Sequence, residues 1–205
     1  AALIDKCLLS SEEMAKFHKE NKFKLYTFNS FFPLEEDFIF KAGRIYTVQL
    51  RTVDEKLAKY FNNNLADVFN DDIKALTIDM SCIYDNFINS IYSLTTVVLK
   101  FEKGYWKEAD VTLDEYEERL RVNLIKKYKT ITGVENIDEN FQLFTGIEFK
   151  NNYPISFSIK DITLLGDKLK LNVASNRMAQ ELAKVALGAG IGEIGSRGAG
   201  FCNYK

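Results

Sequence analysis

The sequence holds few of the residues from which metal sites and disulfides are built. It has one histidine and three cysteines, Cys7, Cys82 and Cys202, among 205 residues. The cysteines are odd in number, far apart and in no ligand spacing, which argues against disulfides and against a zinc site. We therefore expect a reduced, cytoplasmic protein that carries no metal ion and no other cofactor.

Strong charge and long apolar runs are also absent. The net charge is only −2, so binding to RNA would depend on a local basic patch and not on a basic surface as a whole. No apolar run approaches the ~18 residues of a transmembrane helix, and no basic-then-apolar leader opens the chain. The composition, 46% hydrophobic and 27% charged, is that of an ordinary soluble globular protein of one domain or two. The chain begins at Ala1 without Met, and we expect residues ahead of it.

Glycine is sparse except near the C-terminus. Residues 188–201 contain six of the 11 glycines. We expect Ser175 to cap a helix that leads into this stretch, and a short strand at 201–204 to follow it. Glycine lets the chain adopt positive φ and lets another backbone come close. Such a loop, with the guanidinium of Arg197, is suited to hold an anion such as phosphate, and the alternative is a flexible tail.

The spacing of these glycines separates the loop from two other phosphate-binding loops. A Walker loop would need Gly-Lys-Ser/Thr leading into a helix, and a dinucleotide-binding loop would need G-x-G-x-x-G directly after a strand. The spacing here, Gly190-x-Gly192-x-x-x-x-x-Gly198-x-Gly200-Phe201, resembles the glycine-rich loop of the RAMP superfamily of CRISPR systems. It looks most like that of their pre-crRNA processing endoribonucleases. The resemblance implies RNA contacts from Gly190, Gly192, Ser196, Arg197, Gly198 and Gly200.

The predicted elements fit the two tandem ferredoxin-like (βαββαβ) modules that this resemblance implies, so the fold class is α+β. We expect residues 87–205 to form the C-terminal module. Its strands are predicted at 90–101, 141–149, 155–164, 168–173 and 201–204, and its helices from 113 and from 176, with one hairpin added to the order. Thr112-Leu-Asp-Glu115 predicts a capping box at the first of these helices.

Residues 1–86 are expected to form the N-terminal module. Its first helix is predicted to begin with a capping box of Ser10 and Glu13, and its second with Thr52 and Glu55 as caps. Its strands are predicted at 22–32, 37–41, 44–51 and 73–83, the middle two as a hairpin. The βαββαβ order is complete only if a strand precedes residue 1, and without that strand the sheet has an open edge.

His18 is the candidate for proton transfer, because histidine titrates near neutral pH. The alternative is that His18, near a helix C-terminus, only interacts favourably with the helix dipole. The segment from Phe17 to Phe28 resembles the family segment in which a catalytic histidine ends the first helix, a lysine follows six residues later and a strand comes next. The resemblance implies that His18 transfers a proton and that Lys24 stabilises charge at the scissile phosphate.

Asp5 stands where some members of the family have a tyrosine in the first helix. A carboxylate cannot donate a proton at neutral pH unless its pKa is raised well above the reference value. Three roles are therefore open to Asp5: a base, a group that orients His18, or none. Tyr26 is the candidate substitute for the missing proton donor.

Lys126, Lys127 and Lys129 form the densest basic cluster of the chain. We interpret them as a patch that contacts RNA phosphates. The alternative is that the three charges are placed favourably at a helix C-terminus and have no part in binding.

Together these residues predict a metal-independent endoribonuclease that cleaves CRISPR repeat RNA. The ribose 2′-OH attacks the adjacent phosphate and leaves a 2′,3′-cyclic phosphate and a 5′-OH, which requires a base, an acid and a cation but no metal ion. One alternative is a non-catalytic RAMP subunit that binds crRNA in an effector complex, and another is an unrelated α+β protein-interaction domain. The expected partners are repeat RNA and other effector subunits, without a membrane, and both monomer and homodimer remain open.

Overall fold

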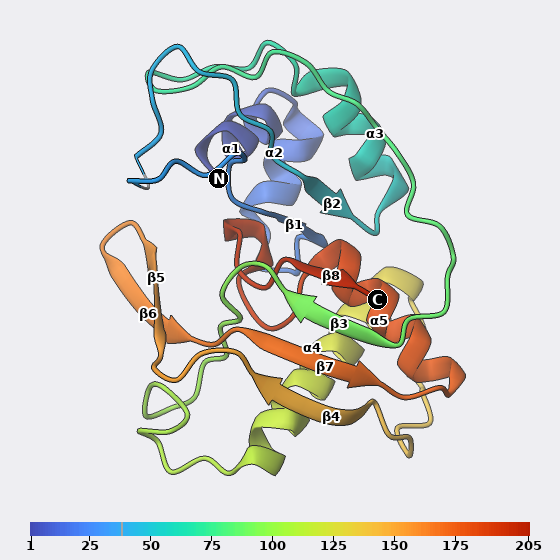
Figure 1. Cartoon of the computed structure of the whole chain (residues 1–205). Coiled ribbons are helices and arrows are strands. Elements are labelled where there is room, and N and C mark those ends of the chain that lie inside the picture. The colour runs from blue at the N-terminus through green and yellow to red at the C-terminus, as the bar shows by residue number, and fades with distance from the viewer. Residues whose placement is uncertain (38) are drawn as a thin grey trace.

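Two α+β modules make up the chain, one above the other in Figure 1. The computed structural model describes residues 1–37 and 39–205. The N-terminal module consists of α1 (Ala2–Leu9), α2 (Glu12–Lys19), β1 (Tyr26–Phe28), β2 (Leu50–Thr52) and α3 (Glu55–Asn64). The C-terminal module consists of β3 (Ser90–Ser93), α4 (Leu113–Thr132), β4 (Phe144–Phe149), β5 (Ile155–Ile159), β6 (Ile162–Gly166), β7 (Leu169–Val173), α5 (Arg177–Ala189), the 3-10 helix η1 (Gly195–Arg197) and β8 (Cys202–Tyr204). We propose that the modules divide between residues 86 and 87, in the coil that joins α3 to β3.

The C-terminal sheet has the strand order β4-β7-β3-β8, and its neighbouring strands are antiparallel. This is the ferredoxin-like order, with α4 after the first strand and α5 after the third. Ile91, in β3, lies opposite Leu171 of β7 on one side and Tyr204 of β8 on the other. β5 and β6 form the added hairpin, which projects from the sheet in Figure 1. The predicted βαββαβ order is confirmed, except that the strand expected at 155–164 is itself a hairpin.

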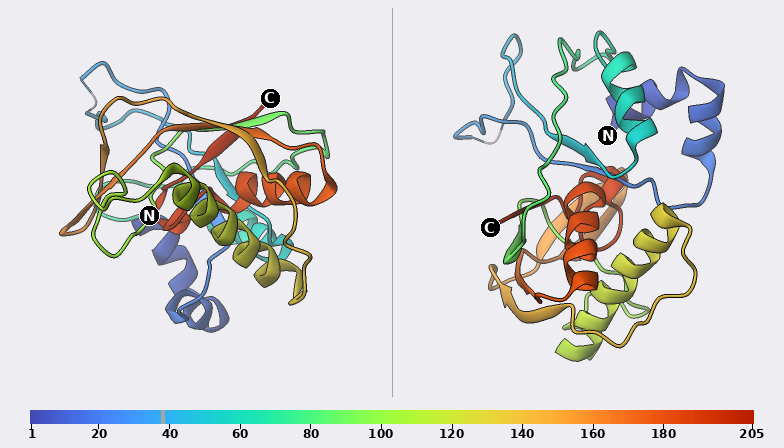
Figure 2. Two further views of the ribbon diagram at one scale, coloured as in Figure 1. Left: turned by 90° about the horizontal axis from the view of Figure 1, so that it is seen from below. Right: turned by 90° about the vertical axis from the view of Figure 1, so that its right-hand side faces the viewer.

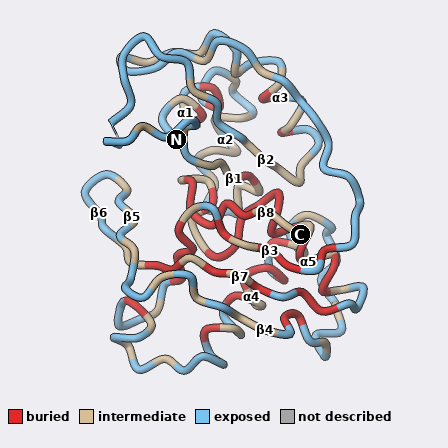
Figure 3. The backbone as a smooth tube through the Cα atoms, in the orientation of Figure 1, coloured by how far each residue is buried: buried red, intermediate tan, exposed pale blue. Residues whose placement is uncertain are grey.

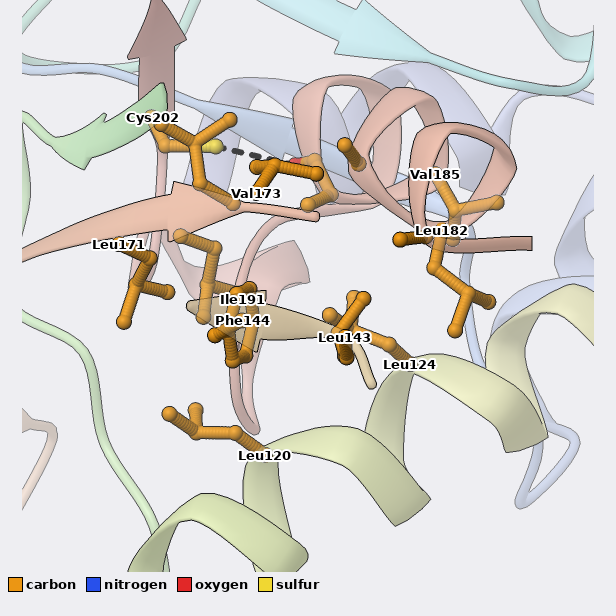
Figure 4. Close-up of a cluster of buried hydrophobic side chains, with 14 of the residues drawn as sticks. Leu120, Leu124, Leu143, Phe144, Leu171, Val173, Leu182, Val185, Ile191 and Cys202 are labelled. Atoms are coloured by element: carbon orange, nitrogen blue, oxygen red, sulfur yellow. Dashed lines mark hydrogen bonds between the residues drawn. The ribbon is translucent and has the colours of Figure 1, made fainter. Parts of the chain in front are cut away.

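The C-terminal core lies between this sheet and the helices α4 and α5. Leu120 and Leu124 of α4 and Leu182 of α5 are buried with Leu171 of β7, as Figure 4 shows. Ile191, which follows α5 in the glycine-rich stretch, is buried in the same cluster. The glycine loop therefore begins inside the core, and the alternative of a flexible tail is wrong.

Of the two predicted capping boxes, one forms. At α4 the amide of Glu115 donates to Thr112 Oγ1 at 3.2 Å, and the amide of Thr112 donates to Glu115 Oε2 at 2.8 Å. The box of Ser10 and Glu13 is wrong, because a further helix, α1, occupies the preceding residues. Ser10 lies in the turn after α1, where its hydroxyl donates to the Cys7 carbonyl at 2.7 Å.

Two other helix caps are displaced from the predicted residue to a neighbour. Asn176, and not Ser175, caps α5 with its side chain. Asp54, and not Thr52, caps α3, where its carboxylate accepts two backbone amides. All four residue types are good N-caps, so propensity alone could not choose between candidates this close together.

Among the described residues the N-terminal sheet consists of β1 and β2, and the predicted hairpin is wrong. Phe32 forms an isolated bridge with Thr47, so residues 44–51 lie against the end of the first predicted strand. They do not pair with 37–41, where no strand forms in the described residues; position 38 lies outside them. Among the described residues between β1 and β2, no further strand forms.

Residues 73–83, which alternate like a strand, form no strand in the structure, and that prediction is wrong. In the βαββαβ order the last strand pairs with the first, as β8 does with β3. No strand among the described residues precedes α1, so residues 73–83 have no such partner. Of the side chains that alternate here, Leu76 and Met80 stay exposed, at 57% each. The edge of β2 is correspondingly open.

The modules meet where the glycine loop lies against β1 and β2. η1 contacts β1, and α5 contacts both strands, which the right-hand view of Figure 2 shows from the side. Arg51, in β2, donates to the Cys202 carbonyl at 2.7 Å, and its guanidinium lies 4.5 Å from the centre of the Phe201 ring. Figure 3 shows the buried course of the chain along this loop. In the described part of the chain, no helix combines the length and apolar character needed to cross a membrane.

Candidate active site

Asp5 and His18 lie side by side although they belong to different helices. Asp5 is in α1, and His18 is in the last turn of α2. His18 Nε2 is 3.8 Å from Asp5 Oδ1, and the two side chains are 19% and 24% exposed. A carboxylate this close limits the orientation of the ring. The two helices thus build a half-buried acid–base pair.

Arg197 reaches the same carboxylate from the other end of the chain. Its Nη1 donates to Asp5 Oδ2, which makes an ion pair between η1 and α1. Ile194, with φ 55°, and Gly198, with φ 91°, flank η1, and both lie in the left-handed region. We call Asp5, His18 and Arg197 the Asp5 cluster; it joins the two modules.

Two polar atoms of the Asp5 cluster are buried without a hydrogen-bond partner among the described residues. They are Asp5 Oδ1, the oxygen nearer His18, and His18 Nδ1. Buried polar atoms in folded proteins nearly always have a partner, from the protein, from water or from a ligand. The Asp5 cluster therefore has unused capacity for hydrogen bonds at the two groups best suited to move a proton.

Tyr26 lies near the Asp5 cluster but is only 2% exposed. Its ring packs edge-on against Phe61, with the ring centroids 5.6 Å apart. Burial, together with the charge of Asp5, raises the pKa of the Tyr26 hydroxyl far above its usual value. The phenol is therefore protonated at neutral pH, so it can donate a hydrogen bond but cannot act as a base.

Lys24 is turned toward the end of α2. Its ammonium donates to the carbonyls of Phe17 and Glu20 at 2.5 and 2.6 Å, and lies 4.9 Å from the centre of the Phe17 ring. Burial lowers the pKa of Lys24 below its usual value. These contacts hold the end of the helix that carries His18. The cation that joins the Asp5 cluster is that of Arg197.

Close packing accounts for the glycines of the loop. A Cβ on Gly198 would lie 2.9 Å from the Phe28 ring, and one on Gly200 would lie 1.8 Å from the Ile191 carbonyl oxygen. The amide of Ile191 donates to the Gly200 carbonyl at 2.8 Å, and the Gly200 amide is used inside the protein as well. The resemblance implied RNA contacts from these glycines, but the amides of Gly190, Gly198 and Gly200 donate to carbonyls within the protein and so do not face an anion. The loop residues that keep partial exposure are Glu193, Ile194, Ser196 and Arg197.

The basic cluster of α4 divides into three different environments. Lys126 is exposed, and Lys129 pairs with Glu139 at 3.0 Å. Lys127 is 3% exposed, and its ammonium donates to three carbonyls at the start of the glycine loop. The prediction that Lys127 contacts phosphate at the surface is therefore wrong, because α4 packs this face against the loop.

Sequence reasoning finds His18 and Arg197 separately but cannot connect them. Arg197 stands 192 positions from Asp5, and no local pattern links the two residues. Arg51 is missed as a contact between modules, because its partners Phe201 and Cys202 are equally remote in sequence. Within the described ranges, no group of three or more His, Cys, Asp or Glu side chains is placed to hold a metal ion.

A family model places the chain among known proteins. The model described as "CRISPR associated protein Cas6, C-terminal" matches residues 90–204, which is more than half of the chain. The chain belongs to the Cas6 family. The matched region contains the ferredoxin-like sheet, α4, α5 and the glycine loop, and so covers one side of the Asp5 cluster.

Solved structures share the Cas6 fold over almost the whole chain. The product of a Cas6-related gene from Pyrococcus furiosus is 17% identical, with a TM-score of 0.68, covering 100% of this chain and 88% of that one. A RAMP protein described as binding different RNA substrates is 18% identical, with a TM-score of 0.65 and coverage of 100% and 89%. A Cas6 product complex is 16% identical, with a TM-score of 0.65 and coverage of 98% and 90%. At these identities the likeness establishes the fold. No curated protein sequence matches the chain.

Proposed function

We propose that this Cas6 family protein is a metal-independent endoribonuclease that cleaves CRISPR repeat RNA. The observation that carries the proposal is the Asp5 cluster, in which the single histidine lies beside a carboxylate that Arg197 also binds. RNA as the ligand is supported by two structures of the same fold, one described as a product complex and one as binding RNA substrates.

In the proposed reaction the ribose 2′-hydroxyl attacks the adjacent phosphorus, and the bond from phosphorus to the 5′-oxygen breaks. The 2′-hydroxyl gives up its proton and the leaving 5′-oxygen gains one, so the products are a 2′,3′-cyclic phosphate and a 5′-OH. His18 makes one of these two proton transfers and water makes the other. Asp5 orients the imidazole, and Arg197 stabilises the charge that develops on the phosphorane.

The other predicted residues have supporting roles in this proposal. Lys24 holds the C-terminal end of α2 and thereby the position of His18. Tyr26 stays protonated and serves as a hydrogen-bond donor. The RNA backbone is contacted by Ser196, Arg197, Lys126 and Lys129, while Gly190, Gly192, Gly198 and Gly200 shape the loop that presents them.

A non-catalytic RAMP subunit that binds crRNA is the second candidate. Two observations favour it: the Lys24 ammonium is engaged with backbone carbonyls, and Asp5 occupies the position where some members of the family have tyrosine. A protein of this kind would bind repeat RNA tightly and leave it intact.

The test uses a labelled repeat RNA from the CRISPR locus of the same genome, incubated with the protein in EDTA. We expect cleavage at one position and a 2′,3′-cyclic phosphate end. A matched RNA with a 2′-deoxyribose at that position should bind equally well and stay intact, because it lacks the nucleophile. Cleavage that appears only on addition of magnesium or manganese would contradict the mechanism, and binding without cleavage would support the second candidate.

A further inference from the structure

Lys127 holds the glycine loop from the inside. Its ammonium donates to the carbonyl oxygens of Ala189 at 3.3 Å, Gly190 at 2.7 Å and Gly192 at 2.7 Å. An ammonium has three N–H donors, so all of them are spent on one short segment between the end of α5 and the loop. The acceptors Gly190 and Gly192 both have positive φ, at 78° and 73°.

Two other polar side chains lie on the same stripe of α4. Arg119, two turns before Lys127, pairs with Glu193 of the loop at 2.6 Å. Asn123 lies between them, is 7% exposed, and its Oδ1 has no hydrogen-bond partner in the part of the chain that the structure describes. Residues four apart lie on the same face of a helix. Arg119 and Lys127 therefore contact the loop from the two ends of one face of α4.

An apolar residue would fill the place of Lys127 at a lower cost in desolvation. Burial lowers the pKa of Lys127 to about 7, which reflects that cost. In some proteins a buried charge fixes one particular arrangement of its partners. The arrangement fixed here is the path of the backbone from Ala189 to Gly192, on which the position of η1 depends.

We propose that Lys127 is a positioning residue that places Arg197 in the RNA site by fixing the start of the glycine loop. The inference rests on the proposed function, in which Arg197 contacts RNA. The hydrogen bond from the Ile191 amide to the Gly200 carbonyl, at 2.8 Å, closes the loop around η1. Because the closed loop is short, a change in the backbone path near Gly192 also changes the position of Arg197.

The first test is a double-mutant cycle of Lys127→Met and Arg197→Ala, measured as the affinity for repeat RNA. Methionine keeps the length of the lysine stem up to Cε and removes the donors. Each single variant should weaken binding roughly tenfold, as the loss of one charged contact does. If Lys127 acts through Arg197, the double variant binds no more weakly than either single variant. Additive effects would overturn the inference.

The matched control is Lys126→Met, which removes the same charge from the exposed neighbouring position. Any effect of this variant on RNA affinity should add to that of Arg197→Ala. Lys127→Gln, which keeps two N–H donors, should weaken binding less than Lys127→Met, and it replaces that variant in the cycle if Lys127→Met does not fold.

The second test needs no RNA and separates this inference from the proposed function. In the free protein, Lys127→Met should speed amide hydrogen exchange at residues 191–200, while β3 and β7 remain as protected as in the parent. Unchanged exchange in the loop would overturn the inference even if the protein cleaves RNA. If the parent does not bind repeat RNA, the proposed function fails, and exchange still decides whether Lys127 fixes the loop.

Discussion

Asp5 and Arg197 form an ion pair between the first helix and the last loop of the chain. The same carboxylate has its other oxygen 3.8 Å from His18 Nε2. One acidic group therefore serves both the residue proposed to move a proton and the residue proposed to bind phosphate. An RNA phosphate at this site has to compete with Asp5 for the Arg197 guanidinium.

Asp5→Asn should have opposite effects on binding and on cleavage. The amide keeps the size of the side chain but removes a negative charge from the RNA site and releases Arg197. We expect RNA affinity to rise about threefold to tenfold, because the pair is partly exposed and screened. The rate of single-turnover cleavage should fall at least about tenfold, because His18 loses the carboxylate that orients it. Weaker RNA binding by this variant would contradict the idea that Asp5 and an RNA phosphate compete for the Arg197 guanidinium.

Gly198→Ala should destabilise the fold through crowding as well as through backbone strain. Gly198 has φ 91°, and an added Cβ would lie 2.9 Å from the Phe28 ring. Gly43, with φ 76° and nothing within 4 Å of an added Cβ, is the matched control. Both alanine variants should lose about 1 kcal/mol for the left-handed conformation. Gly198→Ala should lose a further ~1–3 kcal/mol for overpacking, measured by urea unfolding.

A second substitution isolates the contact between Gly198 and Phe28. Phe28→Leu should cost less stability in the Gly198→Ala background than in the parent, because the smaller side chain relieves the clash. Equal losses in the two backgrounds, or equal losses for Gly43→Ala and Gly198→Ala, would show that the contact carries no strain.

Lys127 should make the free energy of unfolding depend on pH. Burial lowers its pKa to about 7 in the folded protein, against ~10.4 in the unfolded chain. Between these values the unfolded chain binds more protons, so this residue makes stability rise with pH from about 7 to about 10. Below pH 7 both states are protonated, and the full cost of burying the charge is present.

Lys127→Met removes this contribution. Urea unfolding at several pH values between about 7 and 10 should give a smaller rise in stability for Lys127→Met than for the parent. Lys126→Met, which changes an exposed lysine, should keep the parental slope. The same slope in all three proteins would contradict the lowering of the Lys127 pKa by burial, because a pKa equal to that of the unfolded chain adds nothing to the slope.

The sequence predicts the C-terminal module better than the N-terminal one, for physical reasons. The capping box of Thr112 and Glu115 and the strand near Tyr204 depend on local signals and on partners within the same module. Residues 73–83 have the local pattern of a strand but no strand to pair with. A β-strand is stable only in a sheet, so alternation alone is insufficient.

The candidate site is predictable only in part, because its parts come from both ends of the chain. His18 is found as the single histidine in a family-like segment, and Arg197 as the cation of the glycine loop. Their link through Asp5 needs the packing of η1 against the N-terminal module. Lys127 looks like its neighbour Lys126 in sequence, and only the face that α4 buries distinguishes the two lysines.

The most direct test of the account is the single-turnover cleavage of repeat RNA by His18→Ala in EDTA, compared with the parent. If His18 transfers a proton in the transition state, the variant should cleave about 10²–10⁴ times more slowly, which is roughly 3–5 kcal/mol of barrier. Its affinity for the same RNA should stay close to that of the parent, because ground-state binding depends on the phosphate contacts. Cleavage at the parental rate by His18→Ala, or a parent that binds repeat RNA and never cuts it, would contradict the account.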